Sequence, residues 1–178
     1  MLTLSKLSNN ELLFEEVDLN TTIAQILDDI EISIKEKNAV VKVDELPIIE
    51  AVPGQMHQLF QNLISNALKF NENSKPCISI TRQEVGANLN GRKNQFTCIR
   101  VQDNGIGFDE EFKDKIFGIF QRLNGQKYTG SGIGLAICKK IVENHQGYIL
   151  PQSELEKGSY FDIILPVKKV GENARVVA

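Results

Sequence analysis

Several features that would direct the interpretation elsewhere are scarce or missing in this sequence. Its three cysteines, Cys77, Cys98 and Cys138, stand far apart and have no C-x-x-C spacing, so we expect small buried hydrophobic residues in a reducing compartment. No apolar run approaches the roughly 20 residues that span a bilayer. The opening stretch MLTLSKLSNNELLF also lacks the long apolar core of a signal peptide. We therefore expect no direct membrane insertion by this chain.

An excess of positive charge is missing as well. Lys and Arg number 20 against 23 Asp and Glu, which gives a formal net charge of −3 and an isoelectric point near 5.5. Nonspecific nucleic-acid binding depends on basic residues that neutralise phosphates, so the charge argues against nucleic acid as a partner. What is present is a chain of 178 residues with 42% hydrophobic content, which suits one domain with a true core.

The two common phosphate-binding loops are also absent. No G-K-[ST] of a Walker A loop occurs, and in DNGIGF the third glycine of a dinucleotide fingerprint is replaced by Glu110. The glycines of DNGIGF and of TGSGIGLAICKK therefore need another explanation, and a plain turn between a strand and a helix remains one alternative.

The apolar pattern predicts a mixture of strands and helices without strict alternation. FEEVDLN leads into a helix that Asn20 could cap, with apolar residues recurring to Ile34. A second helix runs from Pro53 to about Phe70, and a third from Ser131 to about His145. The predicted strands are AVVKVDEL, PIIEAV, CISITRQEV, QFTCIRVQD, GYILPQSE and SYFDIILP. This order favours an α/β (α+β) two-layer sandwich, a mixed sheet with helices on one face.

One predicted helix, GQMHQLFQNLISNALKF, has an unusual polar face. Gln58, Asn62, Asn66 and Lys69 line up at helical spacing opposite an apolar stripe. A solvated face is the ordinary interpretation, but such faces are mostly built from Glu and Lys. Asparagine offers carbonyl oxygens to a hard cation, and Mg²⁺ takes few protein ligands and completes its shell with phosphate oxygens and water.

The two glycine-rich stretches have different surroundings. Asp103 follows a strand and precedes Gly105 and Gly107, where a carboxylate could accept from an exocyclic amine. The second stretch opens a helix whose N–H groups and dipole favour an anion. Its polar and glycine positions are Gly130, Ser131, Gly132 and Gly134.

In combination, these motifs resemble the ATP-binding catalytic domain of sensor histidine kinases, within the Bergerat-fold (GHKL) ATPase and kinase superfamily. QLFQNLISNALKF resembles the family's asparagine box, DNGIGF its first glycine box, FGIFQRL its phenylalanine box and GSGIGLAICKKIVENHQG its second glycine box. EKGSYFDIILP resembles the closing strand, although Ser159 and Tyr160 stand where threonine or serine and a small residue are common. The resemblance extends from Phe14 to Pro166.

The resemblance implies a role for each matching position. Asn66 would coordinate Mg²⁺, Lys69 would contact phosphate, and Phe70 would pack against adenine. Asp103 would accept from the adenine amino group. The ATP-binding set that it implies is Asn62, Asn66, Lys69, Phe70, Asp103, Gly105, Gly107, Phe117, Phe120, Gly130, Ser131, Gly132, Gly134 and Leu135.

Residues 108–129 resemble the ATP lid, which Phe117 and Phe120 would anchor, although core packing also explains both phenylalanines. Arg122 resembles the lid arginine that reaches the γ-phosphate. The catalytic set that the resemblance implies is therefore Asn62, Asn66, Lys69 and Arg122. Relatives that hydrolyse ATP carry glutamate where Asn62 stands. Because asparagine cannot act as a general base, we expect slow hydrolysis and transfer of the γ-phosphoryl group to a histidine.

The chain itself offers no suitable phosphoacceptor. His57 lies on the asparagine-box helix, and His145 ends a helix, where a cation would simply be favourable. We expect residues 1–13 to be a remnant of a second dimerisation helix, 14–166 the ATP-binding domain and 167–178 a tail. The implied partners are a histidine-containing dimerisation domain in a homodimeric parent kinase and a downstream response regulator. Autophosphorylation by this chain alone is not expected.

Two other functions remain open from the residues. An anti-sigma-type serine kinase shares the fold but usually has glutamate at position 62. A nucleotide-binding module without chemistry would be expected to lose Asn66 or Asp103, which are both present. We expect a cytoplasmic location for this domain, whether or not its parent is anchored in a membrane.

Overall fold

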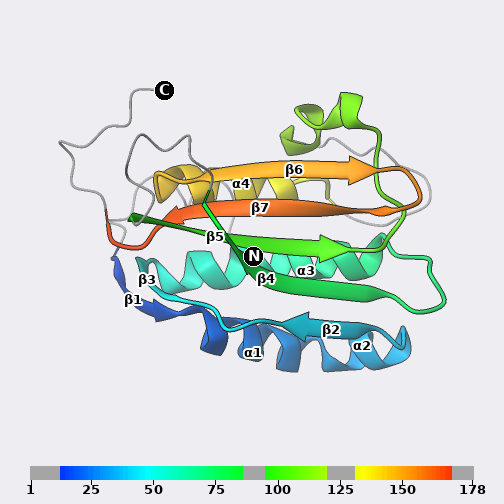
Figure 1. Cartoon of the computed structure of the whole chain (residues 1–178), viewed down its shortest axis with the longest axis horizontal. Helices are drawn as coiled ribbons and strands as arrows, with labels where there is room; N and C mark the ends of the chain where they lie inside the picture. Colours follow the sequence, from blue (N-terminus) through cyan, green and yellow to red (C-terminus); the bar gives the residue numbers. More distant parts are fainter. Residues whose placement is uncertain (1–12, 86–94, 120–130, 170–178) are drawn as a thin grey trace.

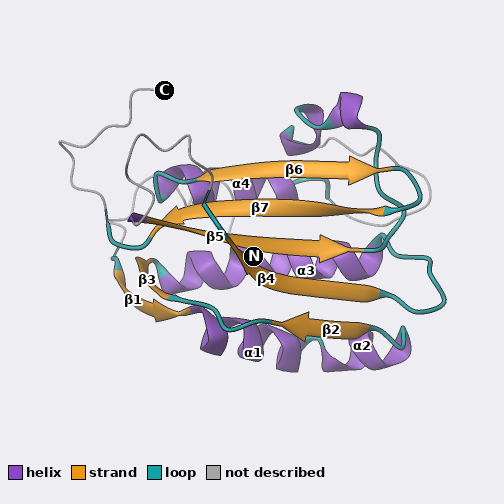
Figure 2. Ribbon diagram, in the orientation of Figure 1, coloured by secondary structure: helices purple, strands orange, loops and turns teal. Residues whose placement is uncertain are grey.

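The structure is a computed structural model that describes residues 13–85, 95–119 and 131–169. Figure 1 shows the chain coloured along the sequence and Figure 2 the same view coloured by secondary structure. The helices are α1 (Leu19–Asp29), α2 (Glu31–Glu36), α3 (Pro53–Lys69) and α4 (Gly134–Asn144), with short 3-10 turns η3 (Glu110–Phe112) and η4 (Lys115–Phe117). The strands are β1 (Glu15–Asp18), β2 (Val40–Val43), β3 (Ile48–Ala51), β4 (Cys77–Gln83), β5 (Phe96–Asp103), β6 (Tyr148–Glu154) and β7 (Gly158–Pro166).

Five strands form a mixed sheet in the order β2-β4-β5-β7-β6. β2 runs parallel to β4, whereas the other neighbouring pairs are antiparallel. The pairing of β4 with β5 places Ile78 opposite Asp103. On the other side of β5, the pairing with β7 places Ser159 opposite the same aspartate. The mixed sheet confirms the predicted fold class.

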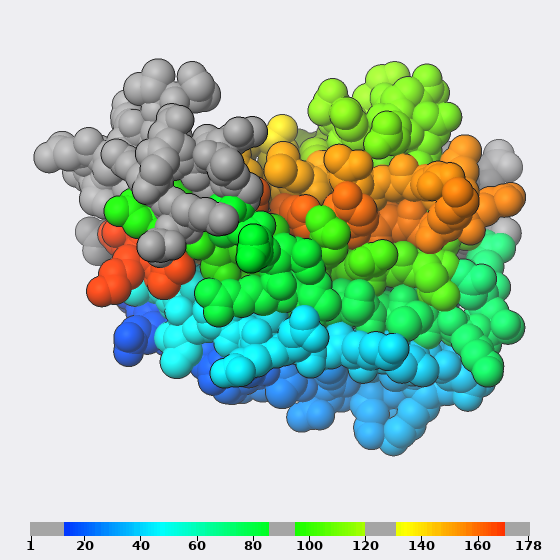
Figure 3. Space-filling view, in the orientation of Figure 1, coloured from blue at the N-terminus to red at the C-terminus, as the bar shows by residue number. Residues whose placement is uncertain are grey.

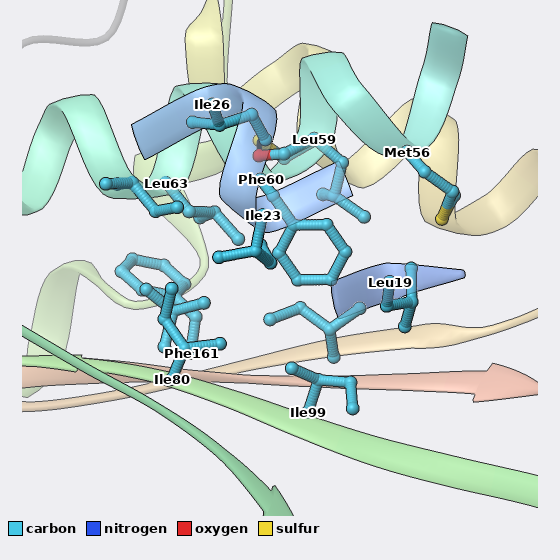
Figure 4. Packing of buried hydrophobic residues seen from close by; sticks show 14 of the residues in the cluster. Leu19, Ile23, Ile26, Met56, Leu59, Phe60, Leu63, Ile80, Ile99 and Phe161 are labelled. Atoms are coloured by element: carbon cyan, nitrogen blue, oxygen red, sulfur yellow. Dashed lines mark hydrogen bonds between the residues drawn. The ribbon is translucent and has the colours of Figure 1, made fainter. Parts of the chain in front are cut away.

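The helices cover one face of this sheet, behind the strands in the view of Figure 1. Figure 4 shows the core between the layers, where α1 and α3 pack their apolar residues against β4, β5 and β7. Phe60 and Ile99 are fully buried at its centre, and burying one such side chain stabilises the fold by about 1.5–3 kcal/mol. Cys98 and Cys138 are buried as expected, whereas Cys77 is only half-buried. Burial raises the pKa of the Cys138 thiol to about 12.

The N-terminal segment differs from the prediction in three details. FEEVDLN contains a strand, β1, which pairs antiparallel with β3 in a separate two-stranded sheet. The helix cap is Asp18, whose Oδ1 accepts the N–H of Asn20 at 2.9 Å. The side-chain amide of Asn20 instead binds the backbone of Leu46. Its Nδ2 donates to the carbonyl of Leu46 at 2.7 Å, and its Oδ1 accepts the N–H of Leu46 at 2.8 Å. The apolar pattern also hides a break at Ile30, whose φ of −108° and ψ of 14° separate α1 from α2.

The other face of the sheet carries polar side chains between apolar ones, and β4 to β7 form much of the surface seen in Figure 3. Arg100 on β5 donates two hydrogen bonds, of 2.7 and 2.8 Å, to the carboxylate of Asp162 on β7. Its guanidinium carbon also lies 3.9 Å from the ring centroid of Tyr160. These contacts join two central strands on the side away from the helices.

Candidate active site

The polar face of α3 meets the N-terminal end of α4. Nδ2 of Asn62 lies 3.4 Å from the carbonyl oxygen of Gly134, the first residue of α4. Two motifs that are 72 residues apart in the sequence are therefore neighbours in space. Asn66 follows Asn62 by one helical turn, and both are half-buried. The amides of α3 thus border the place where the second glycine box begins its helix.

The end of α3 contacts the first glycine box directly. Phe70 ends the helix, and its backbone carbonyl accepts the N–H of Ile106 at 3.0 Å. The ammonium of Lys69 lies 4.8 Å from the centroid of the Phe70 ring. Lys69 and Phe70, predicted to contact phosphate and adenine, therefore lie beside the loop that follows Asp103.

The glycines of DNGIGF have a structural reason that the sequence did not reveal. A Cβ on Gly105 would lie 2.5 Å from the carbonyl oxygen of Phe70. Gly107 has a φ of +63°, and its Cβ would collide with the carbonyl of Glu154. A side chain is excluded at each position by the protein's own backbone. The loop is thereby packed between the end of α3 and the turn that joins β6 to β7.

The β6–β7 turn holds this loop through several further contacts. The N–H of Glu156 donates to the carbonyl of Ile106 at 2.8 Å. Oγ of Ser153 accepts the N–H of Phe108 at 2.7 Å and donates to the carbonyl of Gly158 at 3.0 Å. The sequence indicated no part in the site for Ser153, Glu156 or Gly158. Their separation from DNGIGF in the chain left no local pattern that could have revealed it.

Asp103 is the acid at the centre of the first glycine box. Its Oδ1 accepts the N–H of Gly105 at 2.8 Å, and its Oδ2 accepts the hydroxyl of Ser159 at 2.8 Å. Burial raises the pKa of this carboxyl, against the opposing effect of the bonds from Ser159 and Gly105. A partly desolvated carboxylate with both oxygens oriented can accept one further hydrogen bond from a ligand. Ser159 is thus a site residue that sequence reasoning noticed only as part of a closing strand.

The N-terminus of α4 has the features of an anion site. Gly132 adopts a φ of +69° just before the helix. The N-cap residue Ile133 makes no side-chain hydrogen bond to the helix, in contrast to the cap that Asp18 provides for α1. Ser131 is exposed, and Leu135 packs partly against the core. Uncapped N–H groups and the helix dipole favour phosphate at this end. The predicted glycine residue Gly130 lies outside the described residues.

The stretch predicted to be the lid is described only in part. Phe117 ends the turn η4, packs against the main core, and has the ammonium of Lys139 of α4 5.7 Å from its ring centroid. This contact supports the core-packing interpretation of Phe117 and ties the start of the stretch to α4. The other two predicted lid residues, Phe120 and Arg122, lie outside the described residues.

Neither histidine resembles a reactive group. His57 on α3 has its Nε2 3.5 Å from a carboxylate oxygen of Asp29. His145 is only 5% exposed, with Nδ1 2.8 Å from the carbonyl of Ile141 and Nε2 accepting the N–H of Val52 at 3.0 Å. Burial lowers the pKa of His145. The prediction that a cation at this helix end would be favourable is therefore wrong, because burial and the acceptor role of Nε2 both disfavour the protonated ring.

Comparison with known proteins agrees with this geometry. Residues 51–169 match the family described as histidine kinase-, DNA gyrase B-, and HSP90-like ATPase. The chain belongs to this ATPase family. Within it, the chain is a catalytic domain of the sensor histidine kinase type.

Relatives and solved structures support the same assignment to the histidine kinase ATPase domains. Cyanobacterial phytochrome A of Nostoc sp. (strain PCC 7120) is 40% identical over 168 residues, covering 94% of this chain and 21% of the relative. The catalytic domain of histidine kinase ThkA superposes with a TM-score of 0.72 at 28% identity, covering 88% of this chain and 97% of that one. ThkA in complex with the response regulator protein TrrA gives a TM-score of 0.68 at 26% identity, covering 86% and 42%.

The chain spans about a fifth of the length of the first curated relatives it matches. In the described part of the chain, no helix is long and apolar enough to cross a bilayer. Across the same residues, His, Cys, Asp and Glu form no cluster of three or more that could hold a metal ion.

Proposed function

We propose that this domain binds Mg–ATP and donates the γ-phosphoryl group to a histidine on a dimerisation domain outside these 178 residues. The observation that carries the proposal is the contact between Asn62 and Gly134, which joins the amide face of α3 to the uncapped N-terminus of α4. The contact of Phe70 with Ile106 brings the third element, the loop after Asp103, to the same end of α3.

Each part of this arrangement suits one part of the substrate. The carboxylate of Asp103 would accept from the adenine amine, and the N–H groups at the start of α4 would bind phosphate oxygens. Asn66 would hold Mg²⁺ through its amide oxygen, with phosphate oxygens and water completing the shell. Lys69 would add positive charge to the phosphates. Arg122 and Phe120 would contribute from the lid.

Transfer requires a nucleophile but no base for water. The acceptor histidine nitrogen would form a bond to the γ-phosphorus while the bond from that phosphorus to the β,γ-bridging oxygen breaks. ADP would leave with the bridging oxygen. Asn62 is neutral and donates to Gly134, so it can position but cannot deprotonate water. We therefore expect hydrolysis to be slow, because catalysis here rests on positioning and charge neutralisation.

The remaining assignments also belong to this proposal. The ThkA–TrrA complex supports a response regulator as the downstream partner. Residues 14–166 would be the ATP-binding unit, with 1–13 derived from a dimerisation helix and 167–178 a tail. A cytoplasmic location would give the domain access to ATP and to a response regulator.

Two measurements test the proposal. Calorimetric titration with ATP, with and without Mg²⁺, should give one-site binding that depends on Mg²⁺. Supplied with the histidine-containing domain of its parent kinase, the chain should then transfer phosphate from γ-labelled ATP. Asn66→Asp should impair this transfer, whereas Gln102→Ala, an exposed change on β5, should not. Binding without transfer would instead favour a nucleotide-binding module, and transfer to serine an anti-sigma-type kinase.

A further inference from the structure

Asn104, the residue between Asp103 and the first glycine of DNGIGF, makes an unusual number of contacts with one segment. Its Oδ1 accepts the N–H of Cys77 at 2.7 Å and the side-chain N–H of Asn71 at 2.8 Å. Its Nδ2 donates to the carbonyl of Lys75 at 3.2 Å. All three partners lie in or at the end of the connection between α3 and β4, which runs over residues 70–76.

The backbone of Asn104 reaches the same connection. Its N–H donates to the carbonyl of Cys77 at 3.2 Å, and its carbonyl accepts the side-chain N–H of Asn73. Side chain and backbone of one residue therefore fasten the whole connection to the end of β5. Asn71 is only 4% exposed, so the bond from its Nδ2 to Asn104 satisfies a group that would be costly to leave unpaired.

Both ends of this network lead to residues that the proposed function uses. Lys69 and Phe70 immediately precede the connection, and Asp103 immediately precedes Asn104. The side chain of Asn104 is occupied by its contacts with the connection, so its influence on a ligand passes through these neighbours. A single amide thus couples the end of α3 to the strand end that carries the adenine-binding carboxylate.

We propose that Asn104 is a positioning residue for adenine recognition, which holds Asp103 in register with the end of α3. The proposal rests on the proposed ATP-binding function and deepens it. Asparagine suits the role because it presents an acceptor and a donor side by side. Aspartate would keep the acceptor but lose the donor to Lys75, and alanine would lose both.

The test compares the affinities for ATP and for inosine triphosphate, which has a carbonyl in place of the exocyclic amine. The unaltered chain should prefer ATP because Asp103 accepts from that amine. Asn104→Ala should weaken ATP binding by about tenfold and inosine triphosphate binding much less, since a misplaced carboxylate loses mainly its contact with the amine. Asp103→Asn should show the same loss of preference.

Two further variants separate positioning from folding. Asn104→Asp keeps the bonds from Cys77 and Asn71, so it should stay folded, with a thermal midpoint close to that of the unaltered chain. Its preference for ATP over inosine triphosphate should nevertheless fall by about threefold. A change of this size corresponds to the loss of one weak neutral hydrogen bond. Gln102→Ala, on the same strand but exposed, is the control and should leave the preference unchanged.

The outcomes are distinguishable. If the unaltered chain binds no ATP, the proposed function fails and this inference fails with it. If the unaltered chain binds ATP but Asn104→Asp and Asn104→Ala keep its preference over inosine triphosphate, only the role of Asn104 is overturned. Equal weakening of both nucleotides would likewise contradict a role in adenine recognition and would indicate a purely structural one.

Discussion

Ser159 on β7 lies directly opposite Asp103 on β5, and its hydroxyl donates a 2.8 Å hydrogen bond to Oδ2 of that carboxylate. The strand register places the two residues together although they are 56 positions apart. Oδ1 of the same carboxylate accepts the N–H of Gly105. These two donors keep a partly desolvated acid oriented toward one end of the sheet.

Removing the hydroxyl of Ser159 should therefore weaken nucleotide binding. We expect Ser159→Ala to lower the affinity for ATP by about 0.5–1.5 kcal/mol, the net contribution of one hydrogen bond. Ser159→Thr keeps the hydroxyl and is the matched control, with affinity near that of the unaltered chain. Calorimetric titration measures both. An alanine variant that binds ATP as tightly as the threonine variant would contradict an orienting role for this hydroxyl.

Asp103→Asn should separate binding from stability. Burial raises the folded-state pKa of Asp103 above its ordinary value of 3.8. The contribution of Asp103 to the free energy of unfolding is therefore fully present below pH 3.8, and it is lost as the pH rises through the folded-state pKa. Burial disfavours the charged form, so without nucleotide the asparagine variant should be at least as stable, while its ATP affinity falls by about 1–3 kcal/mol. Denaturant unfolding and calorimetry test the two parts. A variant that is clearly less stable would mean that the bonds from Ser159 and Gly105 outweigh the cost of burial.

Gly107→Ala and Gly54→Ala should have opposite effects. A side chain at Gly107 would adopt a positive φ and collide with the carbonyl of Glu154, so we expect a loss of about 1–3 kcal/mol in the free energy of unfolding, together with weaker ATP binding. Gly54 lies in α3 with nothing within 4 Å of an added Cβ, and alanine there should stabilise by a few tenths to about 1 kcal/mol. Thermal and denaturant unfolding of both variants checks the pair. Similar behaviour of the two would show that backbone crowding around Gly107 does not matter.

Acid should destabilise the domain through His145. Its folded-state pKa is lowered below the ordinary value of 6.5 by burial, and its Nε2 is used to accept from Val52. The stability that it contributes is present above pH 6.5 and falls as the pH drops toward the folded pKa, because the unfolded chain takes up the proton first. Unfolding measured from pH 8 to pH 5 should show this fall.

Two variants test whether His145 is the group responsible. His145→Asn should be less stable at pH 8 but should lose less of its remaining stability on acidification. His57→Gln, on the more exposed histidine beside Asp29, should retain the fall seen in the unaltered chain. An unchanged slope in the His145 variant would assign the acid sensitivity to other groups.

Much of the fold could be predicted because the local pattern and the final structure agree. Pro53 begins α3 as predicted, and the strands predicted at CISITRQEV and QFTCIRVQD are β4 and β5. The N-terminal segment misled because its strand, β1, is four residues long and depends on pairing with β3. The break at Ile30 carries no proline or glycine that would mark it.

Residue types and their spacing by themselves determined the family, the order of the helices and longer strands from β2 onward, and the candidate residues of the α3 face and glycine boxes. These are properties of contiguous stretches of sequence. Only the tertiary structure decided that Ser159 donates a hydrogen bond to Asp103 and that Asn104 binds the α3–β4 connection. It also decided that the backbone beside the β6–β7 turn leaves no room for a side chain at Gly107. The physical reason is that these contacts join segments far apart in the chain. Their partners are chosen by strand register and by backbone packing, which no local pattern of residues encodes.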